Sequence, residues 1–359
     1  MAAAAIRRPA LALAPCAVVL ALAGCAPPAA APLPSDRLFP VRLGGEVGLI
    51  DAGGTMVVEP RFAIVGSLSE DLFAFAEGGK WGYADRTGAT VIAPRFADAA
   101  PFSDGRAAVV IDETLEAAGD DGPLLVLGPG VVSPRRGGYL DRAGELVIPA
   151  RFAGVTTFAE GLAAVREDAL WGYIDEAGAW AVEPRFVRAS PFSEGLAAAA
   201  EREGEVGFVD RSGAWAIAPI FAEVYAFSDG LAPARVADGT WGFVRPDGSW
   251  AIAPGYYWAG RFGDGLAPVK IGSRWGYVDA AGVVAIEPRF ERAEAFSEGR
   301  AAIQVPHAKW GYIDTAGEPV GEPRWDSAEA FAGGLAAVKL GDEWGYVGRD
   351  GRVVWEPSS

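Results

Sequence analysis

The chain has 359 residues, of which 51% are hydrophobic and 22% are charged, and its formal net charge is −16. A chain this acidic repels other polyanions. We therefore expect neither nucleic acid nor a bare anionic surface as a partner. Cys16 and Cys25 are its only cysteines, and both lie near the N-terminus. The rest must therefore be stabilised by a hydrophobic core without disulfides, and its length and composition allow this.

An export signal is predicted at the N-terminus. Arg7 and Arg8 precede an apolar run that ends near Ala23 and is too short to span a membrane. The residues "LAGC" that end at Cys25 resemble a bacterial lipobox, in which the cysteine is acylated and becomes the new N-terminus. We therefore expect residues 1–24 to be removed. A plain secretory peptide with an incidental cysteine is the alternative.

Residues 25–37 are expected to form the acylated cysteine and a Pro/Ala-rich tether. Several acyl chains together hold a protein firmly at a membrane. Ala26, rather than an aspartate, follows the acylated cysteine, which favours the outer membrane over the inner one and a domain that faces the periplasm. The expected location is thus the bacterial cell envelope, with the membrane contacted through the lipid.

A phrase of about 35 residues recurs along residues 38–357. A glycine that follows a Trp-like position marks each copy, and successive glycines are 34 or 35 residues apart except between Gly82 and Gly138. That step contains an insertion of about 22 residues within 111–136. A fixed period in this range indicates one supersecondary unit copied many times. The sequence therefore predicts a single repeat domain of nine units, each buried against its neighbours.

The pattern inside one copy alternates with a period of two, as in "LWGYIDEAGAWAVEPRF" at 170–186. Apolar runs separated by glycine turns predict a meander of three or four β-strands with two apolar faces. We expect Gly172 to let a large side chain of a neighbouring sheet approach, and Pro184 to end its strand. The segment after each "PRF" is a candidate fourth strand.

These phrases resemble the WG-repeat family, also written KWG. The resemblance rests on the surrounding "GYID", "VIAPRF" and "FSEGLAAV" phrases and on the Trp-Gly pairs themselves, which are Trp81-Gly82, Trp171-Gly172, Trp241-Gly242, Trp275-Gly276, Trp310-Gly311 and Trp344-Gly345. It implies an all-β repeat structure, propeller-like or related, with a scaffold role rather than a reaction. A propeller-like ring is favoured and an open solenoid or stack remains the alternative, because the units are short for propeller blades.

Catalytic chemistry has little support in the sequence. His307 is the only histidine and lies in a turn, and no nucleophile elbow is present, so we expect no enzyme, no metal site and no cofactor. Acidic residues recur in the "FSEG" and "GYID" phrases, where turn or capping use is expected. A hard-cation site is a weaker alternative, and the "PRF" arginines are expected to pair with the "GYID" aspartates.

Binding is expected where copies differ. One such place is the insertion within 111–136, and the other is aromatic. Trp180, Trp215 and Trp250 share one strand position in three successive units, and Tyr256, Tyr257 and Trp258 follow closely. Facing solvent, they suit stacking on sugar rings or gripping a peptide; facing the neighbouring sheet, they belong to the core.

Taken together, the sequence predicts a non-catalytic, lipid-anchored scaffold of the cell envelope that binds a protein or peptide partner. The alternative is a module that binds peptidoglycan or another glycan through the exposed aromatic residues. An envelope hydrolase is a remote third hypothesis, and no residue in the sequence is singled out for it.

Overall fold

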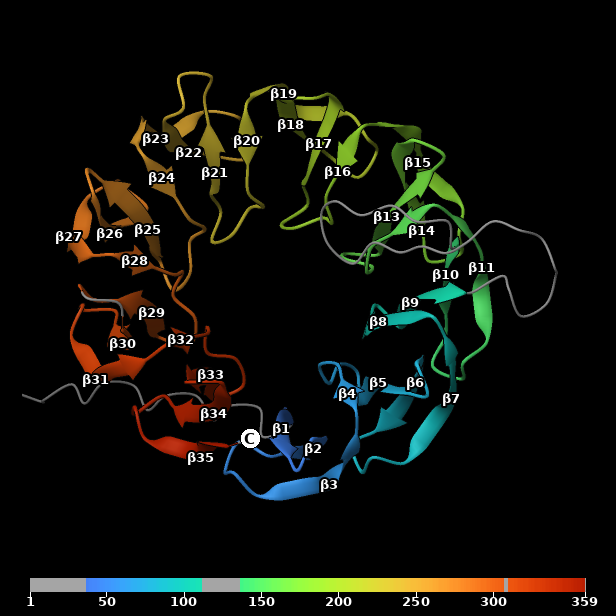
Figure 1. Ribbon diagram of the computed structural model, residues 1–359. Helices are drawn as coiled ribbons and strands as arrows, with labels where there is room; N and C mark the ends of the chain where they lie inside the picture. The colour runs from blue at the N-terminus through green and yellow to red at the C-terminus, as the bar shows by residue number, and fades with distance from the viewer. Residues whose placement is uncertain (1–36, 112–135, 307–308, 359) are drawn as a thin grey trace, which may run out of the picture. The chain divides into compact units, whose positions relative to one another are not determined.

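The computed structural model describes residues 37–111, 136–306 and 309–358. In this part of the chain all regular structure is β, and nine consecutive sheets close into a ring, a nine-bladed β-propeller (Figure 1). The predictions of an all-β fold and of a ring rather than an open stack are confirmed. The predicted signal and Cys25, most of the insertion, and His307 lie outside the described residues. No helix in the described ranges is long and apolar enough to cross a membrane.

The strands of the first five blades follow one another in chain order. Blade 1 contains β1 (Phe39–Leu43), β2 (Glu46–Ile50) and β3 (Met56–Phe62). Blade 2 contains β4 (Ile64–Val65), β5 (Leu72–Glu77), β6 (Lys80–Asp85) and β7 (Thr90–Phe96). Blade 3 contains β8 (Asp98–Ser103), β9 (Arg106–Ile111), β10 (Arg136–Leu140) and β11 (Leu146–Phe152). Blade 4 contains β12 (Gly154–Val155), β13 (Leu162–Glu167), β14 (Leu170–Asp175) and β15 (Trp180–Phe186). Blade 5 contains β16 (Arg188–Ala189), β17 (Ala197–Arg202), β18 (Glu205–Val209) and β19 (Trp215–Phe221).

The last four blades repeat this plan. Blade 6 contains β20 (Glu223–Val224), β21 (Ala232–Arg235), β22 (Trp241–Val244) and β23 (Trp250–Tyr256). Blade 7 contains β24 (Trp258–Ala259), β25 (Leu266–Ile271), β26 (Arg274–Asp279) and β27 (Val284–Phe290). Blade 8 contains β28 (Arg292–Ala293), β29 (Arg300–Gln304), β30 (Trp310–Asp314) and β31 (Pro319–Trp325). Blade 9 contains β32 (Ser327–Ala328), β33 (Leu335–Leu340), β34 (Glu343–Gly348) and β35 (Val353–Ser358).

Each blade is an antiparallel meander that runs from the centre of the ring to its outer edge. The short first strand lies innermost, and the last strand of the blade lies outermost (Figure 1). The fourth strand expected after each "PRF" is present, and it opens the next blade rather than closing its own. In the described residues, blade 1 has only three strands and lacks the innermost one.

The glycine of the Trp-Gly pair lies against a bulge in the outer strand of its own blade. In blade 4, Trp171 pairs with Phe186 and Tyr173 pairs with Val182, so the three residues between Val182 and Phe186 loop outward. A Cβ on Gly172 would lie 2.5 Å from the Val182 carbonyl oxygen. A glycine is therefore required here because the backbone of its own blade lies too close for a Cβ. The expectation that a side chain of the neighbouring sheet approaches Gly172 was wrong.

The prediction that Pro184 ends its strand was wrong. Strand β15 continues through this residue to Phe186. Proline is tolerated there because a residue inside a bulge is not required to donate an amide hydrogen bond to the ladder.

The hydrophobic core lies between blades. Adjacent residues of β14 point to opposite faces: Ile174 packs in the core shared with blade 3, and Tyr173 packs in the core shared with blade 5. Both residues are fully buried. The Tyr173 hydroxyl also donates a hydrogen bond of 2.9 Å to the carbonyl oxygen of Ser190 in the next blade. Two apolar faces per blade, as the alternation predicted, are thus covered by the two neighbours.

Blades 9 and 1 close the ring by side-chain packing, and no strand in the described residues is shared between them. Phe39 packs edge-on against Tyr346 with ring centroids 5.4 Å apart. The Tyr346 hydroxyl donates to the Pro40 carbonyl oxygen at 2.8 Å. In blade 2 the equivalent carbonyl, that of Ala74, accepts from the amide of Gly66 beside the innermost strand. At the seam, the Tyr346 hydroxyl therefore donates to the carbonyl that accepts from a backbone amide in blade 2.

Replacing Gly172 with alanine tests the bulge. The new methyl group would overlap backbone atoms of Val182 and Pro184, so we expect a loss of about 1–3 kcal/mol in the free energy of unfolding. Denaturant unfolding measures this loss. Gly255→Ala is the matched control, because a Cβ there meets nothing within 4 Å, and its effect should stay within about 1 kcal/mol. Equal effects of the two substitutions would contradict this account.

Candidate functional site

The recurrent acidic residues of the "FSEG" turns link neighbouring blades. Each has a left-handed backbone with φ between 50° and 55°. Each carboxylate accepts a hydrogen bond from a glycine amide in the equivalent turn of the next blade. The pairs are Glu70 with Gly105, Asp104 with Gly161, Glu160 with Gly195, Glu194 with Gly230, Asp229 with Gly265, Asp264 with Gly299 and Glu298 with Gly333. These carboxylates are used in turns, as expected, and hold the blades in register.

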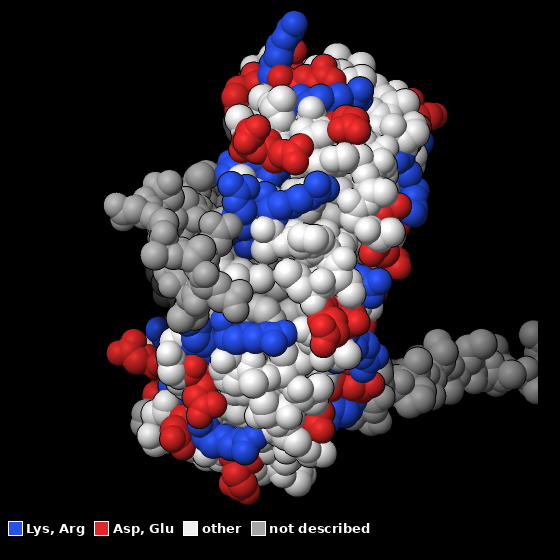
Figure 2. Space-filling model, turned by 90° about the vertical axis from the view of Figure 1, so that its right-hand side faces the viewer, with Lys and Arg blue, Asp and Glu red and all other residues white. Residues whose placement is uncertain are grey.

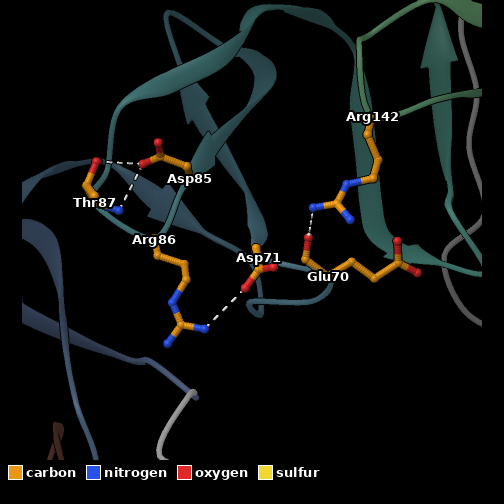
Figure 3. A network of polar contacts seen from close by, with 6 residues as sticks. All are labelled: Glu70, Asp71, Asp85, Arg86, Thr87 and Arg142. Carbon is orange, nitrogen blue, oxygen red and sulfur yellow. Dashed lines mark hydrogen bonds and ion pairs between the residues drawn. The ribbon is translucent and has the colours of Figure 1, made fainter.

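The "GYID" aspartates cap their own turns. Asp85 Oδ1 accepts hydrogen bonds from the amides of Thr87 and Ala89 and from the Thr87 hydroxyl at 2.7 Å (Figure 3). The hydroxyl hydrogen bond holds the pKa of Asp85 below its ordinary value. Ser212 lowers the pKa of Asp210 in the same way. Among the described residues, no three His, Cys, Asp or Glu side chains gather in the way that a metal site requires.

Within the described residues the "PRF" arginines form no ion pairs with the "GYID" aspartates, so this prediction was wrong. All of these arginines except Arg324 contact backbone instead. Arg95 Nη2 donates to the Gly144 carbonyl oxygen of the next blade at 2.6 Å, and Arg61 and Arg185 reach Gly88 and Gly213 likewise. The aspartates are already occupied by their own turn amides, whereas the turn carbonyl is directed at the preceding blade. Nearby, Arg142 of blade 3 donates to the Glu70 carbonyl oxygen of blade 2, and Arg86 pairs with Asp71 (Figure 3).

Trp180, Trp215 and Trp250 are half-buried against the preceding blade. They pack edge-on on Phe152, Phe186 and Phe221, with ring centroids 5.7 to 5.9 Å apart. Each belongs to the border of an inter-blade core. The structure therefore places these three tryptophans in the packing between blades, which is the second of the two arrangements that the sequence left open.

Exposed aromatic residues gather instead where blades 6 and 7 meet. Tyr225 stacks on Trp241 with centroids 5.3 Å apart and planes 9° apart, and Trp258 lies 5.2 Å from Trp241. Trp241 is buried, whereas Trp258 is 38% exposed and its neighbour Tyr257 is 69% exposed. We call Tyr225, Trp241, Tyr257 and Trp258 the aromatic patch. Its two exposed members, Tyr257 and Trp258, directly follow Gly255 and Tyr256, which replace the usual "RF".

Charged side chains border the aromatic patch: Lys270 is the cross-strand partner of Trp258, and an ion pair lies beside Trp241. Arg235 and Glu223 form this pair at 2.9 Å, and the Arg235 guanidinium lies 5.9 Å from the centroid of the Trp241 ring. Burial and the Glu223 carboxylate raise the pKa of Tyr225, and Arg235 opposes them. Tyr256, which is half-buried beside the patch, has its pKa raised by burial. Both phenols therefore remain protonated near neutral pH.

The outer strands of blades 5 and 6 are uncharged. In the position of the "PRF" arginine they carry Ile220, which is 70% exposed, and Gly255. By contrast, the side of the ring that carries β7 and β11 shows basic and acidic side chains close together (Figure 2). The uncharged outer strands of blades 5 and 6, together with the aromatic patch, form a sector spanning blades 5 to 7 that is the candidate functional site. Sequence analysis singled out Tyr256, Tyr257 and Trp258 but missed Tyr225 and Ile220, although an isoleucine in an otherwise basic position was visible in the aligned units.

A known repeat model matches this chain. The model described as "WG containing repeat" matches eight times, at residues 48–81, 81–114, 138–171, 171–202, 207–239, 241–275, 275–305 and 310–344. The chain belongs to the WG containing repeat family. No curated protein matches the sequence. The WG repeats thus account for the Trp-Gly pairs and the period that the sequence displays.

Solved structures are similar to this chain at low sequence identity. A crystal structure of the eukaryotic initiation factor is 12% identical, with a TM-score of 0.59, and the match covers 88% of this chain and 94% of that chain. The computationally designed Ika8 protein is 12% identical, with a TM-score of 0.43 and coverage of 80% and 93%. BamB from Moraxella catarrhalis is 13% identical, with a TM-score of 0.41 and coverage of 79% and 93%. The first of these supports the fold of the WG ring alone.

The Asp85 turn yields a pH prediction. Because its folded pKa lies below the unfolded value, its contribution to stability is present above about pH 4 and is lost as pH falls through the folded pKa. Thr87→Ala removes the strongest hydrogen bond and should raise the pKa of Asp85, measured by NMR titration of the carboxyl carbon. Asp210, whose partner Ser212 is untouched, is the internal control. An unchanged pKa of Asp85 would refute the assignment.

The packing of the three tryptophans predicts a contrast in stability. Trp215→Ala removes the contact with Phe186 of the preceding blade and should lower the free energy of unfolding by about 3–5 kcal/mol. Tyr257→Ala removes a mostly exposed ring and should cost less than about 1 kcal/mol. Thermal and denaturant unfolding compare the two variants. A Trp215 variant as stable as the Tyr257 variant would show that the former ring is not part of the core.

Proposed function

We propose that this WG ring is a non-catalytic scaffold, lipid-anchored in the bacterial cell envelope, that binds a protein or peptide partner through the sector spanning blades 5 to 7. The repeat propeller fits a protein-binding role, because a rigid ring presents many loop and rim positions that are free to vary. The lipid anchor rests on the lipobox-like residues that end at Cys25. The outer membrane, facing the periplasm, is the proposed location.

The observation that carries this proposal is the exposed apolar surface. Ile220 and Tyr257 are 70% and 69% exposed, the highest values among the exposed large hydrophobic side chains of the described residues, and Trp258 next to Tyr257 is 38% exposed. Large apolar side chains left in contact with water, with polar residues around them, mark interaction sites, and tyrosine and tryptophan dominate the binding energy of protein interfaces. The stacked Tyr225 and Trp241 rings pack against Trp258, so its ring is already positioned in the free protein. A preformed surface loses little conformational entropy on binding.

Glycan binding is the second candidate. Exposed aromatic rings such as Tyr257 and Trp258 also suit stacking on a sugar. The structure supports glycan binding less than the sequence did. Trp180, Trp215 and Trp250 pack between blades and do not form an open row. Only the exposed end of the aromatic patch is left for this use.

A paired-variant pull-down tests the proposal. The full-length lipoprotein is crosslinked in envelopes and purified as wild type, as the double variant Tyr257→Ala with Trp258→Ala, and as Trp344→Ala. Trp344 is 44% exposed on the far blade 9 and is the matched control. We expect one envelope protein to be retained by wild type and by Trp344→Ala and to fall about tenfold or more with the double variant.

Two outcomes overturn the proposed function. Equal recovery of partners by the double variant would show that the aromatic patch is not the interface. Sedimentation of wild type with purified peptidoglycan, lost only in the double variant, would establish the glycan alternative instead.

A further inference from the structure

A cavity of about 480 Å³ lies between blades 8 and 9, lined by residues of their outer strands β31 and β35. These two strands are at the lower left of Figure 1. Val320 and Trp325 of blade 8 and Val353 of blade 9 form apolar parts of its wall. The cavity is on the opposite side of the ring from blade 4 and is separate from the aromatic patch. Its size suits a ligand of the class of an amino acid or a short peptide.

The cavity arises from one departure from the repeat. In blade 7, Ile286 pairs with Tyr277. In blade 8 a glycine, Gly321, stands in the position of that isoleucine, and Val320 pairs with Tyr312 instead. Gly321 has φ of 76° and falls in a longer outward bulge. The backbone is therefore shaped differently here from every preceding blade, and a residue with a side chain would be strained in this conformation.

In the same blade, Arg324 is left, among the described residues, without the backbone hydrogen bond that the equivalent arginine of blade 7 makes. Arg289 of blade 7 donates to the Gly317 carbonyl oxygen of the next blade at 2.5 Å. Within the described ranges, the equivalent Arg324 makes no such hydrogen bond, and its guanidinium lies 4.4 Å from the centroid of the Trp325 ring. Arg324 lines the cavity. Its charge is thus held against the Trp325 ring, and no described carboxylate forms an ion pair with it.

Charges of both signs border the cavity. Arg352 of blade 9 adds a second guanidinium, and its only ion pair in the described part of the chain is with Asp350 at 3.5 Å. Glu322 and Glu356 add two carboxylates, and neither forms an ion pair with a described residue. Guanidinium groups recognise carboxylates by charge-assisted hydrogen bonds, and carboxylates recognise ammonium groups. A ligand that carries both groups satisfies both sets.

We propose that this cavity binds a small zwitterion, an amino acid or a short peptide with free termini. Arg324 and Arg352 take its carboxylate, Glu322 or Glu356 takes its ammonium group, and its apolar side chain lies on Val320 and Trp325. The site is independent of the protein-binding sector on blades 5 to 7.

Calorimetric titration of the full-length chain with matched probes tests this site. The probes are leucine and leucyl-alanine, which are zwitterions, and acetyl-leucine, leucine amide and acetyl-leucine amide, which lack one or both charges. We expect a zwitterion to bind about tenfold or more tightly than either singly charged probe, and the neutral probe least of all. Whether leucine or leucyl-alanine binds better tells a free amino acid from a peptide.

Variants assign the binding to the cavity. Arg324→Ala and, separately, Arg352→Ala should weaken the zwitterion and acetyl-leucine by about tenfold and leave leucine amide unchanged. Both side chains are exposed, so neither variant should unfold. The double variant of Tyr257 and Trp258 should bind the probes normally, which separates this site from the proposed function. Absence of zwitterion binding at millimolar concentration, equal binding of all probes, or unchanged binding by both arginine variants would overturn the proposal.

Discussion

Every blade of this ring has two apolar faces, and the fold depends on covering both. A single meander of about 35 residues buries almost nothing by itself, because Tyr173 and Ile174 of the same strand point to opposite sides. A linear stack would leave one face bare at each end. Closing nine blades into a ring removes both ends, and the seam between Phe39 and Tyr346 is the contact that completes it.

Blade-to-blade links use the backbone as the acceptor or donor. The turn carboxylates bind glycine amides, the tyrosine hydroxyls bind carbonyl oxygens, and the "PRF" arginines reach turn carbonyls. A backbone group is present whatever the side chain, so these links persist while the surrounding residues diverge. Phe208 and Phe243 lack the hydroxyl, so their junctions with the next blade are held by apolar packing and by the turn carboxylates Glu194 and Asp229.

The outward bulge of each outer strand is where this scaffold varies its surface. It lies outside the inter-blade core, and its "PRF" arginine is replaced by Ile220 in blade 5 and by Gly255 in blade 6. In blade 8, Gly321 enlarges the bulge and opens a cavity. The cavity between blades 8 and 9 therefore arises from this bulge, whereas Tyr257 and Trp258 directly follow the bulge of blade 6 in the chain. The ring keeps its packing because the residues that change project from the rim and not into the core.

The sequence by itself determined the repeat, the number of units, the all-β class and the alternation that gives each sheet two apolar faces, because period and alternation are local properties of a chain. It also indicated the turn role of the acidic residues. Which neighbour a side chain meets was decided only by the tertiary structure. Trp215 was compatible with solvent or core until the preceding blade placed Phe186 beside it, and Arg95 found a carbonyl rather than an aspartate for the same reason. Pro184 was predicted to end its strand. The bulge that accommodates it forms only when β15 pairs with β14, which the local sequence does not show. Contacts between blades depend on the angle and spacing of the ring, which no single repeat encodes.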